Sequence, residues 1–83
     1  MSNKGHIAGP VRMVKQEGRP KRYQMRVDIA FKLNGKHKRE YWYGFGDDLK
    51  ECWLDMFERF NDEYGNVHIS NGQLRGHEIE YKD

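Results

Sequence analysis

The sequence contains one cysteine, Cys52, and no long run of apolar residues. A single cysteine excludes an intramolecular disulfide, whereas small secreted domains usually carry several, so we expect a reducing, cytoplasmic setting. Residues 1–6 lack an apolar stretch, and no segment approaches the length that crosses a membrane. The sequence therefore predicts no signal peptide, no transmembrane helix and no membrane partner.

Residues that could carry catalysis or hold a metal are also few. The soft metal ligands stand far apart in the chain: His6, His37, Cys52, His68 and His77. None of them has the close spacing of known zinc sites. Asp47 and Asp48 are adjacent, and adjacent residues do not converge on one substrate atom, so helix capping explains them better than acid–base catalysis. Since the chain also lacks a glycine-rich loop with a phosphate-binding lysine, we expect no enzyme activity, no metal and no cofactor.

Positive and negative charges are separated along the chain. Residues 1–46 hold eleven Lys and Arg against three acidic residues, which gives +8, and residues 47–83 hold four against ten, which gives −6. The net charge of +2 conceals this difference. A basic half attracts phosphate groups or acidic protein surfaces, so the asymmetry predicts a charged partner rather than a particular fold.

The length of 83 residues predicts one small domain with a thin core. Residues 1–10 have one sizeable apolar side chain, Ile7, and end in Gly9-Pro10, so we expect a flexible basic arm there. The domain then spans residues 11–83. Because association often completes a thin core, a homodimer stays open as an alternative to a monomer.

Alternation of apolar and polar residues predicts the first strands. Residues 11–15 are typical of a short edge strand, and residues 23–33 alternate strictly with period two. After Asn34-Gly35, residues 36–43 return as the second strand of a hairpin. The alternation in residues 23–33 indicates one buried face and one solvated face.

The register of this hairpin decides which side chains reach the solvated face. A two-residue turn would place Lys38 and Glu40 on the buried face, whereas a three-residue or bulged loop would bury Tyr41 and Tyr43 instead. Burial of aromatic rings outweighs the preference for the shorter turn, so we expect the longer loop. The outer face would then hold Arg26, Lys32, Lys36, Lys38 and Trp42.

One amphipathic helix follows the hairpin. Asp48 is expected to cap it, with Glu51 three residues later, and Gly65-Asn66 to end it. Its apolar stripe contains Leu49, Cys52, Trp53, Met56, Phe57, Phe60 and Tyr64. A last hairpin is expected around a turn at residues 71–72, with Ile69 beside Leu74, Val67 beside Gly76, and a bulge at Gly76 before Ile79 and Tyr81. The predicted order is β-β-β-α-β-β, an α+β domain with an antiparallel sheet packed on one helix.

Basic residues on or near the predicted hairpin form the candidate site. They are Arg19, Lys21, Arg22, Arg26, Lys32, Lys36, Lys38 and Arg39, with Trp42 as an aromatic contact. A two-stranded basic ribbon fits the major groove, where its cations reach phosphates, and Trp42 could stack on a base. We therefore expect a non-catalytic module that binds nucleic acid through a basic sheet face.

Two other interpretations of the same residues stay open. Lysine and arginine also protect the edges of ordinary solvated sheets against aggregation. Alternatively, the domain is a small inhibitor or adaptor, of the kind encoded by phages and mobile elements, that docks on an acidic protein surface. Trp42, Tyr43 and Arg39 would then be the main contacts, because Trp, Tyr and Arg dominate interface energetics.

A family resemblance adds to the nucleic-acid interpretation. Arg22-Tyr23 stands before the long strand, residues 34–39 form the turn, and Gly44-Phe45 stands before the helix. Over residues 11–62 this arrangement resembles the AP2-like, arm-type DNA-binding domains of tyrosine integrases. The resemblance implies that the sheet enters the major groove and that the groove-facing residues are Arg26, Lys36, Lys38, Arg39 and Trp42. The acidic helix face and the additional C-terminal hairpin depart from the family pattern.

Overall fold

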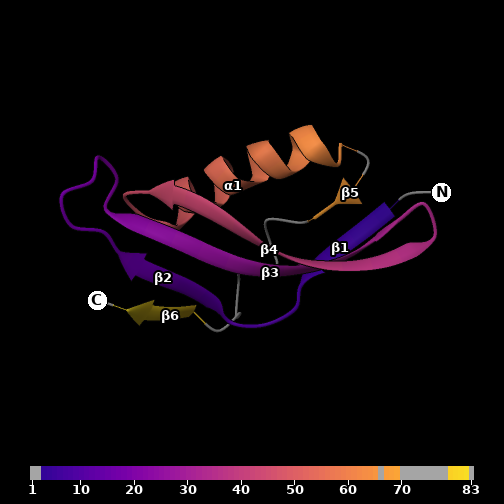
Figure 1. The fold of residues 1–83 in the computed structure, drawn as a ribbon, viewed down its shortest axis with the longest axis horizontal. Coiled ribbons are helices and arrows are strands. Elements are labelled where there is room, and N and C mark those ends of the chain that lie inside the picture. Colours follow the sequence, from indigo (N-terminus) through magenta and orange to yellow (C-terminus); the bar gives the residue numbers. More distant parts are fainter. Residues whose placement is uncertain (1–2, 66, 70–78, 83) are drawn as a thin grey trace.

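The computed structural model describes residues 3–65, 67–69 and 79–82, and shows one helix packed on a six-stranded mixed sheet (Figure 1). The elements are, in chain order, β1 (Asn3–Ile7), β2 (Val11–Lys15), β3 (Tyr23–Leu33), β4 (Lys36–Gly46), α1 (Leu49–Glu63), β5 (Val67–His68) and β6 (Ile79–Lys82). The predicted α+β class is confirmed. The order differs in that four strands, rather than three, precede the helix.

The long strand β3 organises the sheet. β4 pairs with one edge of β3 along its whole length. The other edge of β3 pairs with β1 at residues 29–31 and with β2 at residues 23–26. β5 and β6 extend the sheet as parallel neighbours of β1 and β2 (Figure 1). The sheet is therefore mixed and not antiparallel throughout, and β2 is an inner strand rather than the edge strand predicted.

The expectation of a flexible N-terminal arm is wrong. Residues 3–7, expected in a flexible arm, form β1, because β3 extends past β2 and offers backbone partners that β1 fills. The expected pairing of residues 67–69 with residues 74–76 lies outside the described residues, and the described strands β5 and β6 lie beside β1 and β2. The turn predicted at residues 71–72 lies outside the described residues.

The expectation of a longer β3–β4 loop is also wrong. Asn34 and Gly35 have φ angles of 51° and 84°, the left-handed conformations of a two-residue hairpin turn. Leu33 consequently pairs with Lys36, and the register continues so that Val27 faces Trp42. Each side chain of β4 therefore lies on the face opposite to the one predicted.

The helix explains why this register is favoured. It lies against β4 at Gly44 and Gly46, where a Cβ atom on Gly44 would stand 2.0 Å from the carbonyl oxygen of Cys52. Lys36 and Lys38 are exposed, so their charges are not buried by this register. Further along β4, the half-buried Glu40 accepts hydrogen bonds from the Trp42 indole (3.1 Å) and from the hydroxyl group of Tyr64 (2.9 and 3.1 Å).

The core lies between α1 and one face of the sheet, as the apolar stripe predicted. Trp53, Met56 and Phe60 are at most 1% exposed, and they pack in one cluster with the buried side chains of β2 and β3. At the C-terminal end of the helix, Phe60 makes edge contacts with the rings of Phe31 and Trp42. Asp48 caps the helix as predicted, because its Oδ1 accepts a hydrogen bond of 2.8 Å from the Glu51 amide.

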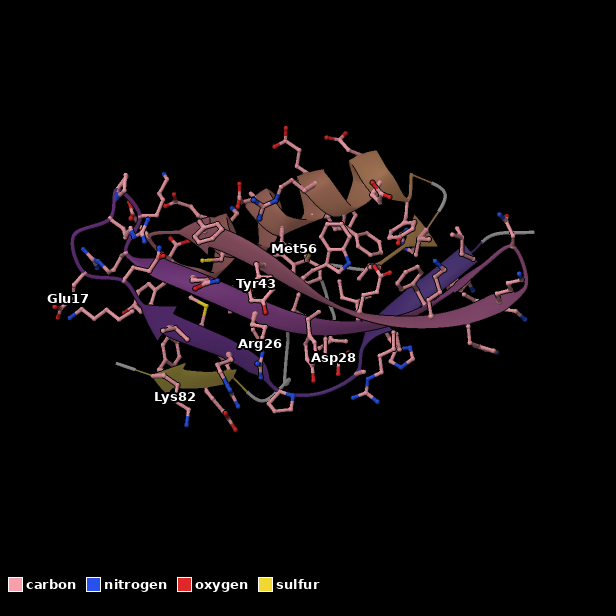
Figure 2. The ribbon with its side chains drawn as sticks, viewed as in Figure 1. Glu17, Arg26, Asp28, Tyr43, Met56 and Lys82 are labelled. Carbon is pink, nitrogen blue, oxygen red and sulfur yellow. The ribbon has the colours of Figure 1, made fainter. Side chains whose placement is uncertain are left out.

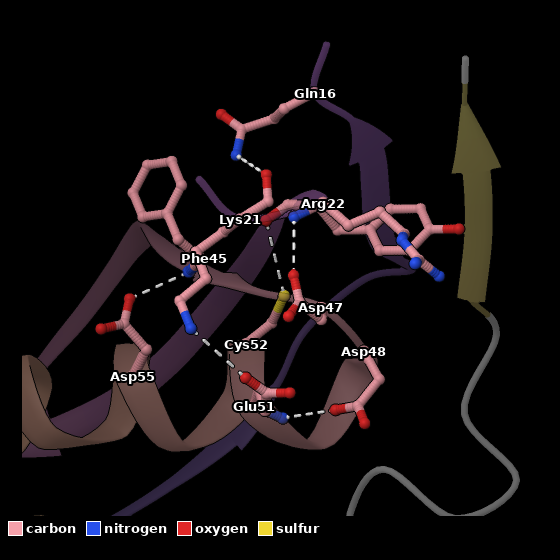
Figure 3. A network of polar contacts seen from close by, with 10 residues as sticks. Gln16, Lys21, Arg22, Phe45, Asp47, Asp48, Glu51, Cys52 and Asp55 are labelled. Atoms are coloured by element: carbon pink, nitrogen blue, oxygen red, sulfur yellow. Dashed lines mark hydrogen bonds and ion pairs between the residues drawn. The ribbon is translucent and has the colours of Figure 1, made fainter. Parts of the chain in front are cut away.

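Polar contacts tie the start of the helix to the loop before β3 (Figure 3). Lys21 forms an ion pair of 3.5 Å with Glu51, and the Arg22 amide donates to Asp47 Oδ1 at 3.0 Å. On the next turn, Asp55 Oδ2 accepts a bond of 2.9 Å from the Phe45 amide. The helix is thus anchored to both the loop and β4 through its acidic residues.

Candidate functional site

The two faces of the sheet differ in what covers them. Met25, Val27, Ile29 and Phe31 of β3 are buried beneath α1, and the intervening side chains therefore point to the opposite face. No described element covers that face, which we call the open face. By the strand registers it carries Lys4, His6, Arg12, Arg26, Asp28, Ala30, Lys32, His37, Arg39, Tyr41, Tyr43 and Glu80.

The middle of the open face combines arginine with exposed tyrosine. Arg26 stands directly opposite Arg12 on one side and Tyr43 on the other, and its guanidinium carbon lies 4.9 Å from the centre of the Tyr41 ring. Tyr41 is 59% exposed and Tyr43 is 43% exposed. Figure 2 shows Arg26, Asp28 and Tyr43 near one another, with Met56 on the helix side. Like charges placed opposite each other destabilise a sheet, so the Arg12–Arg26 pair favours an anionic partner.

A hollow of about 550 Å³ lies further along the sheet, where side chains of the open face meet Phe31 and Lys38 of the helix side. Ala30 forms its floor, because this small side chain stands between the larger ones of His6 and Arg39. The lining consists of Lys4, His6, Ala30, Phe31, Lys32, His37, Lys38 and Arg39. None of these eight residues is acidic, so the hollow is a strongly positive depression.

The carboxylates of the open face are both paired with arginine. Asp28 Oδ2 accepts hydrogen bonds from Nε (2.8 Å) and Nη2 (2.6 Å) of Arg39, and this contact raises the pKa of the guanidinium. Glu80 lies 3.8 Å from Nε of Arg12. In the described part of the chain, Lys4, Arg26 and Lys32 have no such acidic partner. The open face therefore keeps an excess of positive charge, whereas the exposed side of α1 is acidic.

The residues predicted from the sequence do not form one surface. Arg26, Lys32 and Arg39 lie on the open face as one group. Arg19, Lys21 and Arg22 lie in the loop between β2 and β3, near the acidic start of the helix. Lys36, Lys38 and Trp42 belong to the helix side of β4, contrary to the expected outer face.

Trp42 in particular is not exposed for stacking on a ligand. Its ring is half-buried and lies 5.1 Å from the ring of Phe60 and 6.1 Å from that of Tyr64. The expected register instead buried Tyr41 and Tyr43, which lie on the open face, and Tyr43 was named only as a contact of the alternative, protein-binding interpretation. The Asn34-Gly35 turn was the signal that could have identified them, since its two-residue form places both tyrosines on the face of Arg26.

Cys52, the one thiol, lies in the core. It is fully buried, and burial together with the negative charges of Asp48 and Asp55 raises its pKa from about 9 to about 11. Its Sγ contacts the carbonyl oxygen of Tyr23 at 3.8 Å. A buried thiol that holds its proton is a poor nucleophile, so Cys52 acts as a core residue.

This raised pKa predicts a pH-dependent stability. The folded protein keeps a proton that the unfolded chain releases above about pH 9, so the free energy of unfolding should fall as the pH rises from about 9 to about 11. The Cys52→Ala variant lacks this contribution and should lose stability less steeply over the same range. Urea denaturation at several pH values measures how steeply the free energy of unfolding falls with pH in each protein. Equal slopes would contradict the raised pKa of Cys52.

Comparisons with known proteins find no match: no family model, curated protein or solved structure is similar to the chain. No family model therefore supports the resemblance to integrase arm-type domains. Within the described residues, no group of three or more His, Cys, Asp or Glu side chains is placed to hold a metal ion. The helix described here is too short and too polar to cross a membrane.

Proposed function

We propose that this protein is a non-catalytic, cytoplasmic module that binds single-stranded nucleic acid on its open face. The observation that carries the proposal is the composition of that face, where cations from four strands surround two exposed tyrosines and both carboxylates are already paired. Phosphate groups are attracted to lysine and arginine, and unpaired bases stack on aromatic rings.

The arrangement favours a single strand over a duplex. The major groove is about 12 Å wide and admits a two-stranded ribbon, whereas β1 and β2 widen the β3–β4 hairpin at residues 29–31 and 23–26. Tyr41 and Tyr43 offer ring surface on an open sheet, and stacking on it requires bases that are not paired with a second strand. The acidic side of α1 faces away from this surface and does not repel the bound strand.

Removal of open-face cations should weaken binding. We expect the Arg26→Ala/Lys32→Ala variant to bind a labelled oligonucleotide of about 12 nucleotides roughly tenfold more weakly, because two phosphate contacts are lost. The slope of log affinity against log salt concentration should become shallower by about 1.4, since each contact to a single strand contributes about 0.7. Fluorescence anisotropy at several salt concentrations measures both quantities.

The matched control is Lys36→Ala/Lys50→Ala, which removes the same charge from exposed residues that line neither hollow and lie on the helix side of β4 and on α1. This control should change affinity by less than about threefold, because its lysines are not part of the open face. An equal loss in both variants would contradict an open-face site. Absence of binding even at low salt would contradict nucleic-acid binding altogether and favour an acidic protein as the partner.

A further inference from the structure

Asp28 is a buried acid in the middle of a basic surface. The residue is only 7% exposed, although it points to the open face. Its Oδ2 accepts two hydrogen bonds from Arg39, but no group of the described chain donates to Oδ1. Buried polar atoms in folded proteins nearly always have a hydrogen-bond partner, so an unpaired carboxylate oxygen indicates a donor that comes from a ligand.

Asp28 is one of the residues that line a second hollow of the open face, of about 230 Å³. The lining consists of Gly9, Pro10, Arg12, Arg26, Asp28, Arg39 and Tyr41. Sites for drug-sized molecules have volumes of roughly 300–1,000 Å³, so this hollow has room for one flat ring system rather than a whole nucleotide. Tyr41 and Pro10 supply apolar surface, and the arginines supply hydrogen-bond donors.

The hydrogen-bonding groups of the hollow define the ligand. Oδ1 of Asp28 has two lone pairs and requires donors, whereas Arg12 and Arg26 require acceptors. Guanine is the base that presents two adjacent donors, N1–H and N2–H, next to the acceptor O6. Adenine and cytosine have a single amino group beside ring nitrogens, and uracil and thymine have a single N–H. Arginine also pairs with O6 and N7 of guanine more often than with other base edges.

We propose that this hollow is a guanine-binding site within the single-stranded nucleic-acid interface, a proposal that rests on the function inferred above. Guanine N1–H and N2–H donate to Asp28 Oδ1, and O6 accepts from Arg12 or Arg26. Asp28 therefore selects the base, and Arg39 holds its carboxylate in place from the other side. The surrounding cations bind the phosphates of any strand and contribute affinity without sequence preference.

Oligonucleotides that differ in one base test the proposal. The probes are oligothymidines of about 12 nucleotides that carry guanine, inosine or adenine at the central position. The guanine probe should bind at least about fivefold more tightly than the adenine probe, because a good two-bond contact to a base discriminates by that much or more. Inosine, which lacks the N2 amino group, should fall between the two.

The Asp28→Asn variant identifies the residue responsible. The amide oxygen of the new side chain should turn to Arg39, which requires an acceptor, so that its NH₂ group faces the hollow and repels the donors of guanine. The preference for guanine should then be lost, while affinity for plain oligothymidine is kept or rises because a negative charge is removed. Circular dichroism and thermal melting confirm that the variant is folded.

Glu58→Gln is the matched control, since it removes a carboxylate from the exposed side of α1, away from the hollow and its arginines. This variant should keep the full preference for guanine. Equal affinity of the wild-type protein for the guanine and adenine probes would overturn the guanine site, even if the Asp28→Asn variant failed to fold. The proposed function would survive that result as long as oligothymidine binds. Failure of every probe to bind would overturn both.

Discussion

Replacement of Gly44 by alanine is expected to destabilise the protein by about 3 kcal/mol, which is a large fraction of the total stability of a small domain, about 5–15 kcal/mol. The added Cβ atom would lie 2.0 Å from the carbonyl oxygen of Cys52 and 2.9 Å from the Cβ atom of Met56. Both neighbours belong to α1, so neither can move without displacing the helix from the sheet. Urea denaturation followed by circular dichroism measures the loss.

Gly9→Ala is the matched control for this prediction. A Cβ atom on Gly9 would meet nothing within 4 Å, so the same chemical change should leave the free energy of unfolding within about 0.5 kcal/mol of the wild-type value. Similar stabilities of the two variants would contradict the close approach of α1 to β4.

Truncation of Phe60 to alanine is expected to have an effect of similar size, about 3–5 kcal/mol. Phe60 is fully buried, and its ring centre lies 5.3 Å from that of Phe31, 5.1 Å from that of Trp42 and 5.3 Å from that of Tyr64. Its removal leaves a cavity between helix and sheet and also ends three ring contacts. Chemical denaturation monitored by tryptophan fluorescence measures the change.

The comparison variant is Phe57→Ala, which removes the same side chain three residues earlier in the helix. Phe57 is half-buried at the margin of the core, and the one ring contact found for it is with Trp53 at 6.0 Å. Its truncation should cost clearly less than that of Phe60. A larger loss for Phe57 than for Phe60 would show that the aromatic cluster is not the centre of the core.

Long periodic segments were predictable from the sequence, and the register between them was not. β3 and α1 have the expected bounds, because eleven residues of alternation and four turns of apolar stripe leave few other arrangements. The register of β4 depended on a contact with another element, namely the approach of α1 to Gly44 and Gly46. Local propensity at Asn34-Gly35 indicated the right turn, but the preference for burying the aromatic rings of β4 overruled it.

The candidate site was only partly predictable for the same reason. A shift of one residue moves every side chain of a strand to the other face, so one wrong turn placed Trp42 outside and Tyr41 inside. β1 was missed because it has almost no apolar pattern, and its conformation depends on the exposed edge of β3. Arg26 and Lys32 were placed on the solvated face because the alternation of β3 was predicted correctly, whereas the expected register left Arg39 off that face, although it lies across from Ala30.

The charge separation between the acidic helix and the open face has a kinetic consequence. The two regions lie on opposite sides of one sheet, so the molecule has an electric dipole directed across its thin dimension. Near any polyanion such a molecule experiences a torque that turns the sheet toward the negative charge before contact is made. Collisions made helix first are repelled, and those made sheet first are accelerated. Added salt should therefore lower the association rate constant more than it raises the dissociation rate constant.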